Sequence, residues 1–402
     1  MAARVLRARW LLPIDRSPIE NGWVELAGDR IVRIGAGRAP LPPDDLGDVA
    51  LLPGLVNAHT HLELSWLRGR VPPAGSMVEW IRALLAVRAS GPDGGEEARV
   101  ASTRGALKEM VDTGTVLAGD VTNTLVTPVQ LGESGMAGVV FHELLGFSST
   151  GPMAQVREAW RRVDEIKRDV HQADLSYSVV AHAPYSVSPA LFSEIARQRR
   201  TAPLTVHLGE SAEEVEFLRT GRGPFRELLQ WLDVWSNEWR APECDPVEYL
   251  SRVGYLRNGL MAVHGVHLSD DSLLVLRNAG ATVVTCPRSN EWVGAGLPRL
   301  SHFYGCGLPV AIGTDSLAST SSLSMFDELA ALRRIAPDVS AAGLLESATR
   351  RGAQALGYGQ DFGTLAPGKR AALVTVQVPA GVADVEEYLV SGVPASSIRR
   401  AA

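Results

Sequence analysis

Apolar runs alternate with helical patterns over most of this 402-residue chain. Strand-like runs separated by amphipathic stretches are typical of a parallel sheet whose connections are helices. Helical patterns lie at 101–112, 156–170, 191–198, 269–278 and 325–335. We predict strands at 51–58, 115–121, 138–144, 175–181, 204–206, 261–263, 281–285 and 309–313. Eight is the strand number of an α/β (β/α)8 TIM barrel, whose chemistry lies at the carboxyl ends of the strands.

The two ends of the chain carry a different pattern. Short apolar pieces at 10–14, 23–26 and 31–34 are separated by Pro, Gly, Asn and Asp, and strand-like pieces recur at 371–378 and 388–390. Such pieces predict short antiparallel strands. We infer that the two ends pair into one small β domain, formed by residues 1–50 and 364–402, beside a barrel of residues 51–363.

Composition and charge narrow the function. The net charge is −6, from 45 acidic and 39 basic residues, without a basic stripe, which argues against nucleic acid as a partner and favours a small molecule. The three cysteines have no CxxC spacing, so we expect neither a disulfide framework nor a cysteine zinc site, and a reducing cytoplasm is the expected location. Neither a signal sequence nor a long apolar segment is apparent, so we expect no membrane association.

Histidines and acids gather where the predicted strands end. They are His59 and His61, Asp120, Glu143, His182, His207 with Glu210, His264 and Asp315. Strand alternation places His59 and His61 on one face. A single histidine is more simply a hydrogen-bonded core residue, but imidazoles plus a carboxylate suit zinc or ferrous iron with one position left for water. We predict one divalent ion, zinc ahead of iron, held by His59, His61, His207 and Asp315.

A metal ion lowers the pKa of bound water towards 7 and so creates hydroxide at neutral pH. Glu210 lies three residues after His207 and is the candidate proton shuttle; the alternative is a first-turn acid of the helix that follows at 211–219. His264 is the candidate for orienting or polarising the hydroxide, and the alternative there is a structural histidine. No lysine ends the strand at 175–181, so a carbamylated lysine between two metals is unsupported.

The motifs Pro53-Gly-Leu-Val-Asn-Ala-His-Thr-His61, Val206-His-Leu-Gly-Glu210, Val263-His264, Thr285-Cys-Pro-Arg-Ser-Asn290, Gly313-Thr-Asp-Ser316 and Gly363-Thr-Leu-Ala-Pro-Gly-Lys369 resemble the amidohydrolase superfamily. The ordered set spans nearly the whole chain and is most similar to the cytosine deaminase and chlorohydrolase branch, in particular aminodeoxyfutalosine deaminases. The resemblance implies a TIM barrel with a composite β-sandwich from both termini, one divalent metal, and the ligand and catalytic roles given above. One departure is Ala372, where relatives usually carry Asp.

The resemblance also suggests substrate contacts. Glu63 resembles a residue that hydrogen-bonds a ring edge, His182 resembles a second contact, and we add Ser316 and Arg288 as residues expected to face the ligand. Aromatic residues at helical spacing, Trp231, Trp235 and Trp239, form either a core-facing stripe or a lid over a planar substrate.

The leading hypothesis is a metal-dependent hydrolytic deaminase of an aminated purine-like nucleoside, 6-amino-6-deoxyfutalosine or a related compound, which would place it in menaquinone biosynthesis. One alternative is a hydrolase of guanine, cytosine or a chloro- or amino-triazine. Another is a non-catalytic binding protein on the same fold. The expected partner is a small heterocyclic substrate, and a homodimer is left open.

Overall fold

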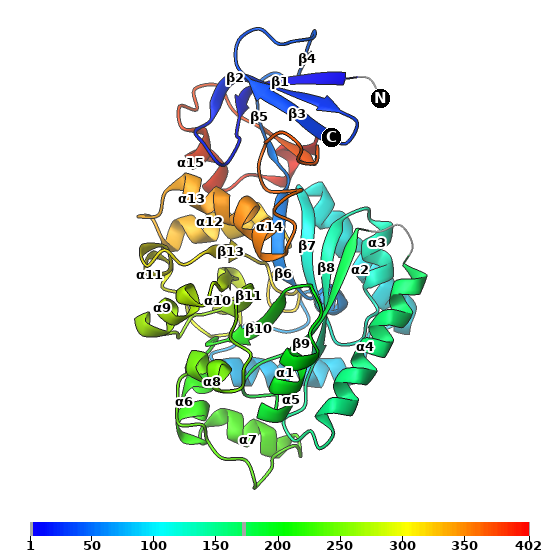
Figure 1. The fold of residues 1–402 in the computed structure, drawn as a ribbon, viewed down its shortest axis with the longest axis vertical. Coiled ribbons are helices and arrows are strands. Elements are labelled where there is room, and N and C mark those ends of the chain that lie inside the picture. Colours follow the sequence, from blue (N-terminus) through cyan, green and yellow to red (C-terminus); the bar gives the residue numbers. More distant parts are fainter. Residues whose placement is uncertain (1–2, 171–173, 402) are drawn as a thin grey trace.

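Two four-stranded parallel sheets form the barrel (Figure 1) in the computed structural model, which describes residues 3–170 and 174–401. The first sheet contains β6 Leu55–Thr60, β7 Thr115–Thr122, β8 Ala137–Leu144 and β9 Leu175–Ala181. The second contains β10 Leu204–Leu208, β11 Leu260–His264, β12 Thr282–Thr285 and β13 Val310–Ile312. These eight strands confirm the barrel predicted from the sequence.

Hydrogen bonds at the strand ends join the two sheets. The N–H of His207 donates to the carbonyl of His182 at 2.9 Å across one seam. Across the other seam, the N–H groups of Thr314 and Asp315 both donate to the carbonyl of His59 at 3.1 Å. The residues that close the barrel are therefore the histidines and the aspartate that the sequence placed at the strand ends.

Helices surround the strands, and α1 lies across the barrel near the carboxyl ends of β6 to β9 (Figure 1). Serine caps begin several of them: Ser188 and Ser211 each accept a backbone N–H of the first turn. The helices are α1 Met77–Ser90, α2 Gly95–Asp112, α3 Pro128–Glu133, α4 Pro152–Asp169, α5 Pro189–Gln198, α6 Ala212–Thr220, α7 Pro224–Trp231, α8 Pro246–Arg252, α9 Asp270–Asn278, α10 Pro287–Trp292, α11 Leu300–Gly305, α12 Met325–Ile335, α13 Ala341–Glu346 and α14 Gly352–Ala355, with a 3₁₀ helix over Leu62–Leu67 and a π-helical turn over Ser347–Arg351.

The predicted strand at 51–58 is two strands that meet at Gly54. Residues Val49–Pro53 form β5, which pairs with the terminal strands, and β6 begins at Leu55. A Cβ atom at Gly54 would lie 2.2 Å from Cγ1 of Val116, so only glycine allows the chain to pass from one sheet to the other here. The terminal sheet therefore extends to Pro53, beyond the boundary at residue 50 expected from the sequence.

The two ends of the chain share one sheet. Its strands are β1 Ala3–Leu11, β2 Ile19–Ala27, β3 Arg30–Gly35, β4 Asp44–Asp45, β5, β14 Leu373–Gln377 and β15 Ile398–Arg400. β14 pairs antiparallel with β5, placing Thr375 opposite Leu51. Ile31 exchanges hydrogen bonds of 2.8 Å with Gly368 and Lys369, so the sheet curls around its own apolar core. The predicted composite β-sandwich of both termini is thus confirmed.

The predicted strand at 388–390 is wrong, because this segment is the end of helix α15 Val385–Val390. Asp384 caps the helix by accepting the N–H of Glu387 at 2.9 Å, and Leu389 and Val390 are buried. The capping aspartate favours a helix here, although the short apolar run by itself is typical of a strand. The last strand is β15 instead.

The three tryptophans do not share a helix. α7 ends at Trp231, and Asp233 adopts a positive φ of 55° that stops the helical repeat. Trp231 is 57% exposed, with the guanidinium of Arg82 4.9 Å from the centre of its ring. Trp239 is half-buried and stacks on the buried Phe217, with the ring centres 4.7 Å apart. The three tryptophans therefore do not form one helical stripe, although Trp235 and Trp239 both pack, partly buried, against the core.

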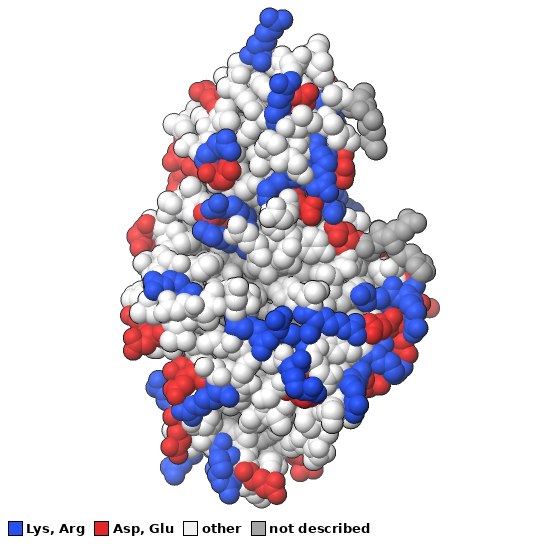
Figure 2. All heavy atoms as spheres, viewed as in Figure 1, with Lys and Arg blue, Asp and Glu red and all other residues white. Residues whose placement is uncertain are grey.

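The surface mixes both charges. Figure 2 shows basic and acidic side chains next to one another over much of one face, and the ion pair of 2.6 Å between Arg200 and Asp164 of α4 is one example. Within residues 3–170 and 174–401, none of the helices has the length and apolar character needed to cross a membrane.

Candidate active site

Three of the predicted metal ligands converge at the end of β6. The Nε2 atoms of His59 and His61 are 3.2 Å apart, and Oδ1 of Asp315 lies 3.6 Å from Nε2 of His61 and 4.0 Å from Nε2 of His59. Ligand atoms about 2.0–2.1 Å from a tetrahedral zinc ion stand about 3.3 Å from one another. The spacing of these three side chains therefore fits one shared divalent ion.

His207 and His264 complete the cluster from the neighbouring sheet. Nδ1 of His207 lies 3.1 Å from Nε2 of His264, and the ring centre of His207 lies 5.0 Å from that of His59. Burial, reinforced by the surrounding histidines, lowers the pKa of His59 well below its usual value. His59 is thus neutral at pH 7, as a metal-binding imidazole must be.

Two members of the cluster have left-handed backbones. His264 has a φ of 75° and Asp315 a φ of 59°. A residue other than glycine in such a backbone conformation destabilises the fold by about 1–3 kcal/mol. Residues with this strain are typically found at functional sites. This backbone conformation turns the side chains inwards at the last residue of β11, His264, and three residues after β13, at Asp315.

Glu210 faces the cluster from the loop after β10. Its Oε2 lies 3.5 Å from Nε2 of His264 and 3.8 Å from Nδ1 of His207. Burial would raise the pKa of Glu210, but His264 and His207 outweigh it and lower the pKa below the usual value. The carboxylate is therefore ionised at neutral pH and is able to accept a proton.

Other residues begin the helix after Glu210, so Glu210 is not the acid of its first turn. Ser211 caps α6 by accepting the N–H of Glu214 at 3.2 Å. The buried carboxylate of Glu214 accepts the N–H groups of Gly209 and Glu210, each at 3.0 Å. These bonds hold the backbone of the loop and leave the Glu210 side chain free to face the histidines.

Two residues of helix α10, Ser289 and Asn290, support the cluster. Both lie in the motif that ends at Asn290, but the sequence alone assigned no contact to either. The hydroxyl of Ser289 donates to Oδ2 of Asp315 at 2.6 Å. The side-chain amide nitrogen of Asn290 lies 2.9 Å from Nδ1 of His264. Such bonds orient metal ligands and their neighbours.

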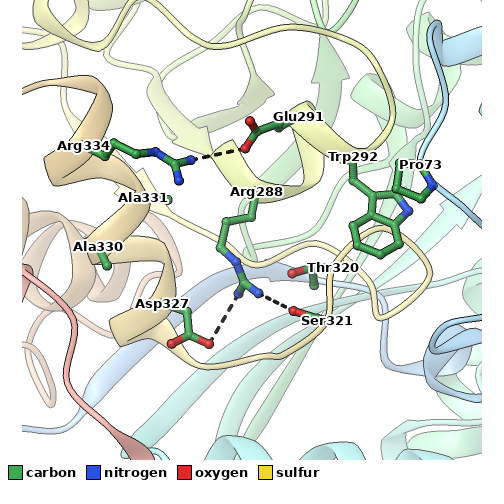
Figure 3. Close-up of a pocket in the computed structure, with 10 residues that line it drawn as sticks. All are labelled: Pro73, Arg288, Glu291, Trp292, Thr320, Ser321, Asp327, Ala330, Ala331 and Arg334. Carbon is green, nitrogen blue, oxygen red and sulfur yellow. Dashed lines mark hydrogen bonds and ion pairs between the residues drawn. The ribbon is translucent and has the colours of Figure 1, made fainter.

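Arg288 does not face the site, which corrects the sequence-based expectation. Successive residues of a helix point about 100° apart, so Arg288 leaves α10 on the side away from Ser289 and Asn290. It reaches into a separate surface groove of about 470 Å³ and donates to Oγ of Ser321 at 2.8 Å, with Asp327 3.7 Å away (Figure 3). In this structure Arg288 ties α10 to the loop before α12.

The carboxylate of Glu63 likewise forms its hydrogen bonds within the protein. Its Oε1 accepts the N–H of Asn123 at 3.1 Å, and its Oε2 accepts the hydroxyls of Thr122 and Thr124 at 2.6 Å and the N–H of Thr124 at 3.1 Å. Glu63 is 3% exposed and is not among the described residues that line the cavity. It holds the loop after β7, which replaces the predicted contact with a substrate ring.

A cavity of about 230 Å³ opens above the cluster. Its inner part includes His61, His207, Glu210 and Asp315, together with the predicted contacts His182 and Ser316 and the unassigned strand-end acid Glu143. His182 is held by a bond of 2.6 Å between its Nδ1 and the hydroxyl of Ser186. The outer walls of the cavity are formed by α1 and α7, which the sequence pattern had not singled out.

A closed eight-stranded barrel with a buried histidine and aspartate cluster at its carboxyl end defines a barrel enzyme with a candidate metal site. The model of the amidohydrolase family matches residues 50–396. The chain therefore belongs to the amidohydrolase family and is an enzyme that hydrolyses carbon–nitrogen bonds.

Individual relatives agree with this assignment. The chain is 29% identical over 378 residues to the 5-methylthioadenosine/S-adenosylhomocysteine deaminase of Bacillus cereus, covering 89% of this chain and 81% of that protein. An adenosine deaminase from Xanthomonas campestris with bound zinc has a TM-score of 0.81 at 26% identity, covering 98% of this chain and 90% of that one. The aminofutalosine deaminase of Helicobacter pylori also has a TM-score of 0.81 at 26% identity, with coverage of 97% and 95%.

Proposed function

We propose that this enzyme is a metal-dependent hydrolytic deaminase of adenosine-like nucleosides that releases ammonia. The observation that carries the proposal is the contact of 3.5 Å between Glu210 and His264 beside the histidine and aspartate cluster on the cavity floor. The three relatives described above are all named as deaminases, which supports this reaction over other hydrolyses.

We propose His59, His61, His207 and Asp315 as the holders of one divalent ion. Zinc is favoured because neutral imidazoles and one carboxylate suit it and because the Xanthomonas campestris relative contains it. When bound, the ion lowers the pKa of a water molecule in the cavity and supplies a nucleophile at neutral pH.

Glu210 is the proposed proton shuttle. Its ionised carboxylate accepts a proton from the attacking water and passes it to the ring nitrogen next to the reacting carbon. Glu210 then takes the proton of the newly added hydroxyl group and passes it to the exocyclic nitrogen, so that the carbon–nitrogen bond breaks, a carbonyl forms and ammonia leaves. His264, held from behind by Asn290, orients the water through the nitrogen that faces Glu210.

The particular substrate we propose is a 6-aminopurine nucleoside with an extended substituent on its ribose, such as 6-amino-6-deoxyfutalosine. His182 and Ser316 line the cavity beside the cluster and are the proposed ring and ribose contacts. The long outer walls of the cavity favour such a nucleoside over a small free base such as cytosine.

A substrate panel tests the proposal. Metal-loaded enzyme is incubated with adenosine, 5′-methylthioadenosine, S-adenosylhomocysteine and 6-amino-6-deoxyfutalosine, and with guanine, cytosine and a chlorinated triazine. We expect ammonia from the nucleosides at a far higher kcat/KM than from the free bases. Chloride from the triazine alone, or ammonia from cytosine alone, would make the enzyme another kind of hydrolase. Binding of a nucleoside without turnover would point to a non-catalytic binding protein.

A further inference from the structure

A separate pocket lies at the opposite end of the barrel from the histidine cluster. Its volume is about 200 Å³, and it is bordered by Leu204 and Leu260, the first residues of β10 and β11, and by Ala355 at the end of α14. The cluster lies near the carboxyl ends of the same two strands, at His207 and His264. The length of the barrel strands therefore separates this pocket from the candidate active site.

The polar side chains that line this pocket all carry hydrogen-bond donors, and none of them is acidic. They are Arg199, Thr201, Arg257, Asn258 and Gln354. Arginine is charged at any pH that proteins experience. Among the described residues, the lining therefore brings two positive charges to the pocket and no negative charge.

Arg257 is the more buried of the two arginines. Its Nη1 and Nη2 atoms donate to the carbonyls of Ala196 at 3.3 Å and Gly254 at 2.6 Å. Its Nε atom is buried and has no hydrogen-bond partner among the described residues. Burial and the nearby guanidinium of Arg199 lower the pKa of Arg257 below its usual value. Carbonyl oxygens satisfy two of its N–H groups but do not neutralise its charge.

Another arginine with a buried Nε atom is neutralised by the protein itself. Arg333 also has an Nε atom without a hydrogen-bond partner, but its guanidinium forms an ion pair of 2.9 Å with Glu387. Along residues 3–170 and 174–401, no carboxylate forms an ion pair with Arg199 or Arg257. Buried charges in proteins are normally paired, so these two arginines favour an anion from outside the chain.

A phosphate group matches the donors of this pocket. Guanidinium groups bind phosphate through parallel N–H···O bonds, and a doubly charged anion beside two of them offsets their mutual repulsion. The volume of about 200 Å³ lies below the range of about 300–1,000 Å³ that is typical of pockets for drug-sized ligands. The occupant is therefore small, or only its phosphate group enters the pocket.

We propose that Arg199 and Arg257 form a binding site for a phosphate-type anion at the amino-terminal end of the barrel, with Thr201, Asn258 and Gln354 donating to its remaining oxygens. The bound anion joins the residue that follows α5, the turn before β11 and the end of α14. It therefore stabilises the folded protein. The inference does not depend on the deaminase reaction.

Calorimetric titration of the metal-loaded enzyme with sodium phosphate tests the inference, with sodium chloride holding the ionic strength constant. We expect saturable binding, and a higher Tm in phosphate than in chloride. A second titration uses glycerol 3-phosphate and identifies the source of the anion. Tighter binding of the ester indicates a phosphorylated metabolite, whereas tighter binding of phosphate indicates the free ion.

Variants locate the anion. Arg257→Gln should weaken phosphate binding by about 10- to 100-fold, the usual worth of hydrogen bonds to a charged group, and should remove the rise in Tm. Arg199→Gln should have a smaller effect because Arg199 is more exposed. Arg240→Gln is the matched control, since Arg240 donates to the carbonyls of Asn237 and Trp239 and lies outside the pocket. The readout is the difference in Tm with and without phosphate, so a general loss of stability in a variant cancels.

Three results would overturn the site. They are the absence of saturable phosphate binding, acetate binding as tightly as phosphate, and phosphate affinity that both pocket variants retain. The last result would place the phosphate elsewhere, for example at the metal ion. Ammonia release is measured separately with the substrate panel, so failure of this site leaves the proposed deaminase standing, and failure of the deaminase leaves this site standing.

Discussion

Oε2 of Glu210 lies 3.5 Å from Nε2 of His264, and both side chains are almost completely buried. The pair brings together a carboxylate from the loop after β10 and an imidazole from the end of β11. On the far side of the imidazole, Asn290 lies 2.9 Å from Nδ1 of His264. A buried proton acceptor beside a candidate metal site is the arrangement that hydrolytic proton transfer requires.

Replacing Glu210 with glutamine should abolish most turnover while sparing the metal site. The amide accepts no proton from water, and a positioned acid–base group contributes roughly 10²- to 10⁴-fold. Measurement of kcat by ammonia release, with metal content by elemental analysis, checks this. Glu213→Gln, on the first turn of α6, is the control. Near-wild-type kcat in the Glu210 variant would remove it from the mechanism.

The enzyme should bind about one divalent ion per chain. The His59, His61 and Asp315 group and the His59, His207 and His264 group share His59, so they describe one centre. A further candidate group, formed by Glu143, His182 and His207, depends on His207 and competes with that centre for it. Chelation should abolish activity and lower Tm, and readdition of zinc should restore both. Two equivalents in elemental analysis would refute the single site.

Ser289→Ala should weaken metal binding. The variant removes the bond of 2.6 Å to Oδ2 of Asp315, and loss of such a supporting bond typically costs about 10- to 100-fold in metal affinity or activity. Competition with a chromophoric chelator measures the affinity. Ser301→Ala, which removes a bond to Asp338 at the surface, is the matched control. Equal affinities in the two variants would contradict a role for Ser289.

Glu63→Gln should destabilise the protein because its carboxylate serves donors from Thr122, Asn123 and Thr124. An amide turns one acceptor into a donor, and each buried group left without a partner costs about 1–3 kcal/mol. A clear fall in Tm is expected by calorimetry. Glu79→Gln, in the first turn of α1, should leave Tm nearly unchanged. An unchanged Tm with a raised KM in the Glu63 variant would restore the substrate contact that we first expected.

Glu328 should make stability depend on pH. Burial raises its pKa from 4.5 to about 8 in the folded chain, against the opposing charge of Arg288. The folded state therefore holds a proton that the unfolded state releases above pH 4.5. Stability should fall as pH rises from about 4.5 to 8, by at most about 1.4 kcal/mol per pH unit, and should stop falling above that range.

The comparison that checks this is Tm against pH for the wild type and Glu328→Gln, since the amide resembles the protonated acid. We expect the Tm of the wild type to fall relative to that of the variant between pH 5 and 8. Asp327→Asn, a half-exposed neighbour on α12, is the control. Parallel curves for the wild type and the Glu328 variant would show that Glu328 does not titrate in this range.

Much of this architecture was predictable because it depends on short-range periodicity. Alternation of strands and helices predicts the barrel, and the two-residue repeat of a strand predicts that His59 and His61 share a face. Parallel strands bring their carboxyl ends to one edge, so His207, His264 and Asp315 could be expected to meet there. These relations follow from the type of element and its direction, which local sequence encodes.

Other contacts were decided only by the tertiary structure. Glu63 binds a loop about 60 residues away, Arg288 faces a groove while Ser289 next to it faces the site, and Asp384 makes a helix of an expected strand. A polar side chain satisfies its hydrogen bonds with whichever neighbour packing supplies, and local patterns do not specify that neighbour. The sequence by itself therefore determined the barrel and its cluster of ligands, whereas packing decided which surrounding polar groups face the cavity.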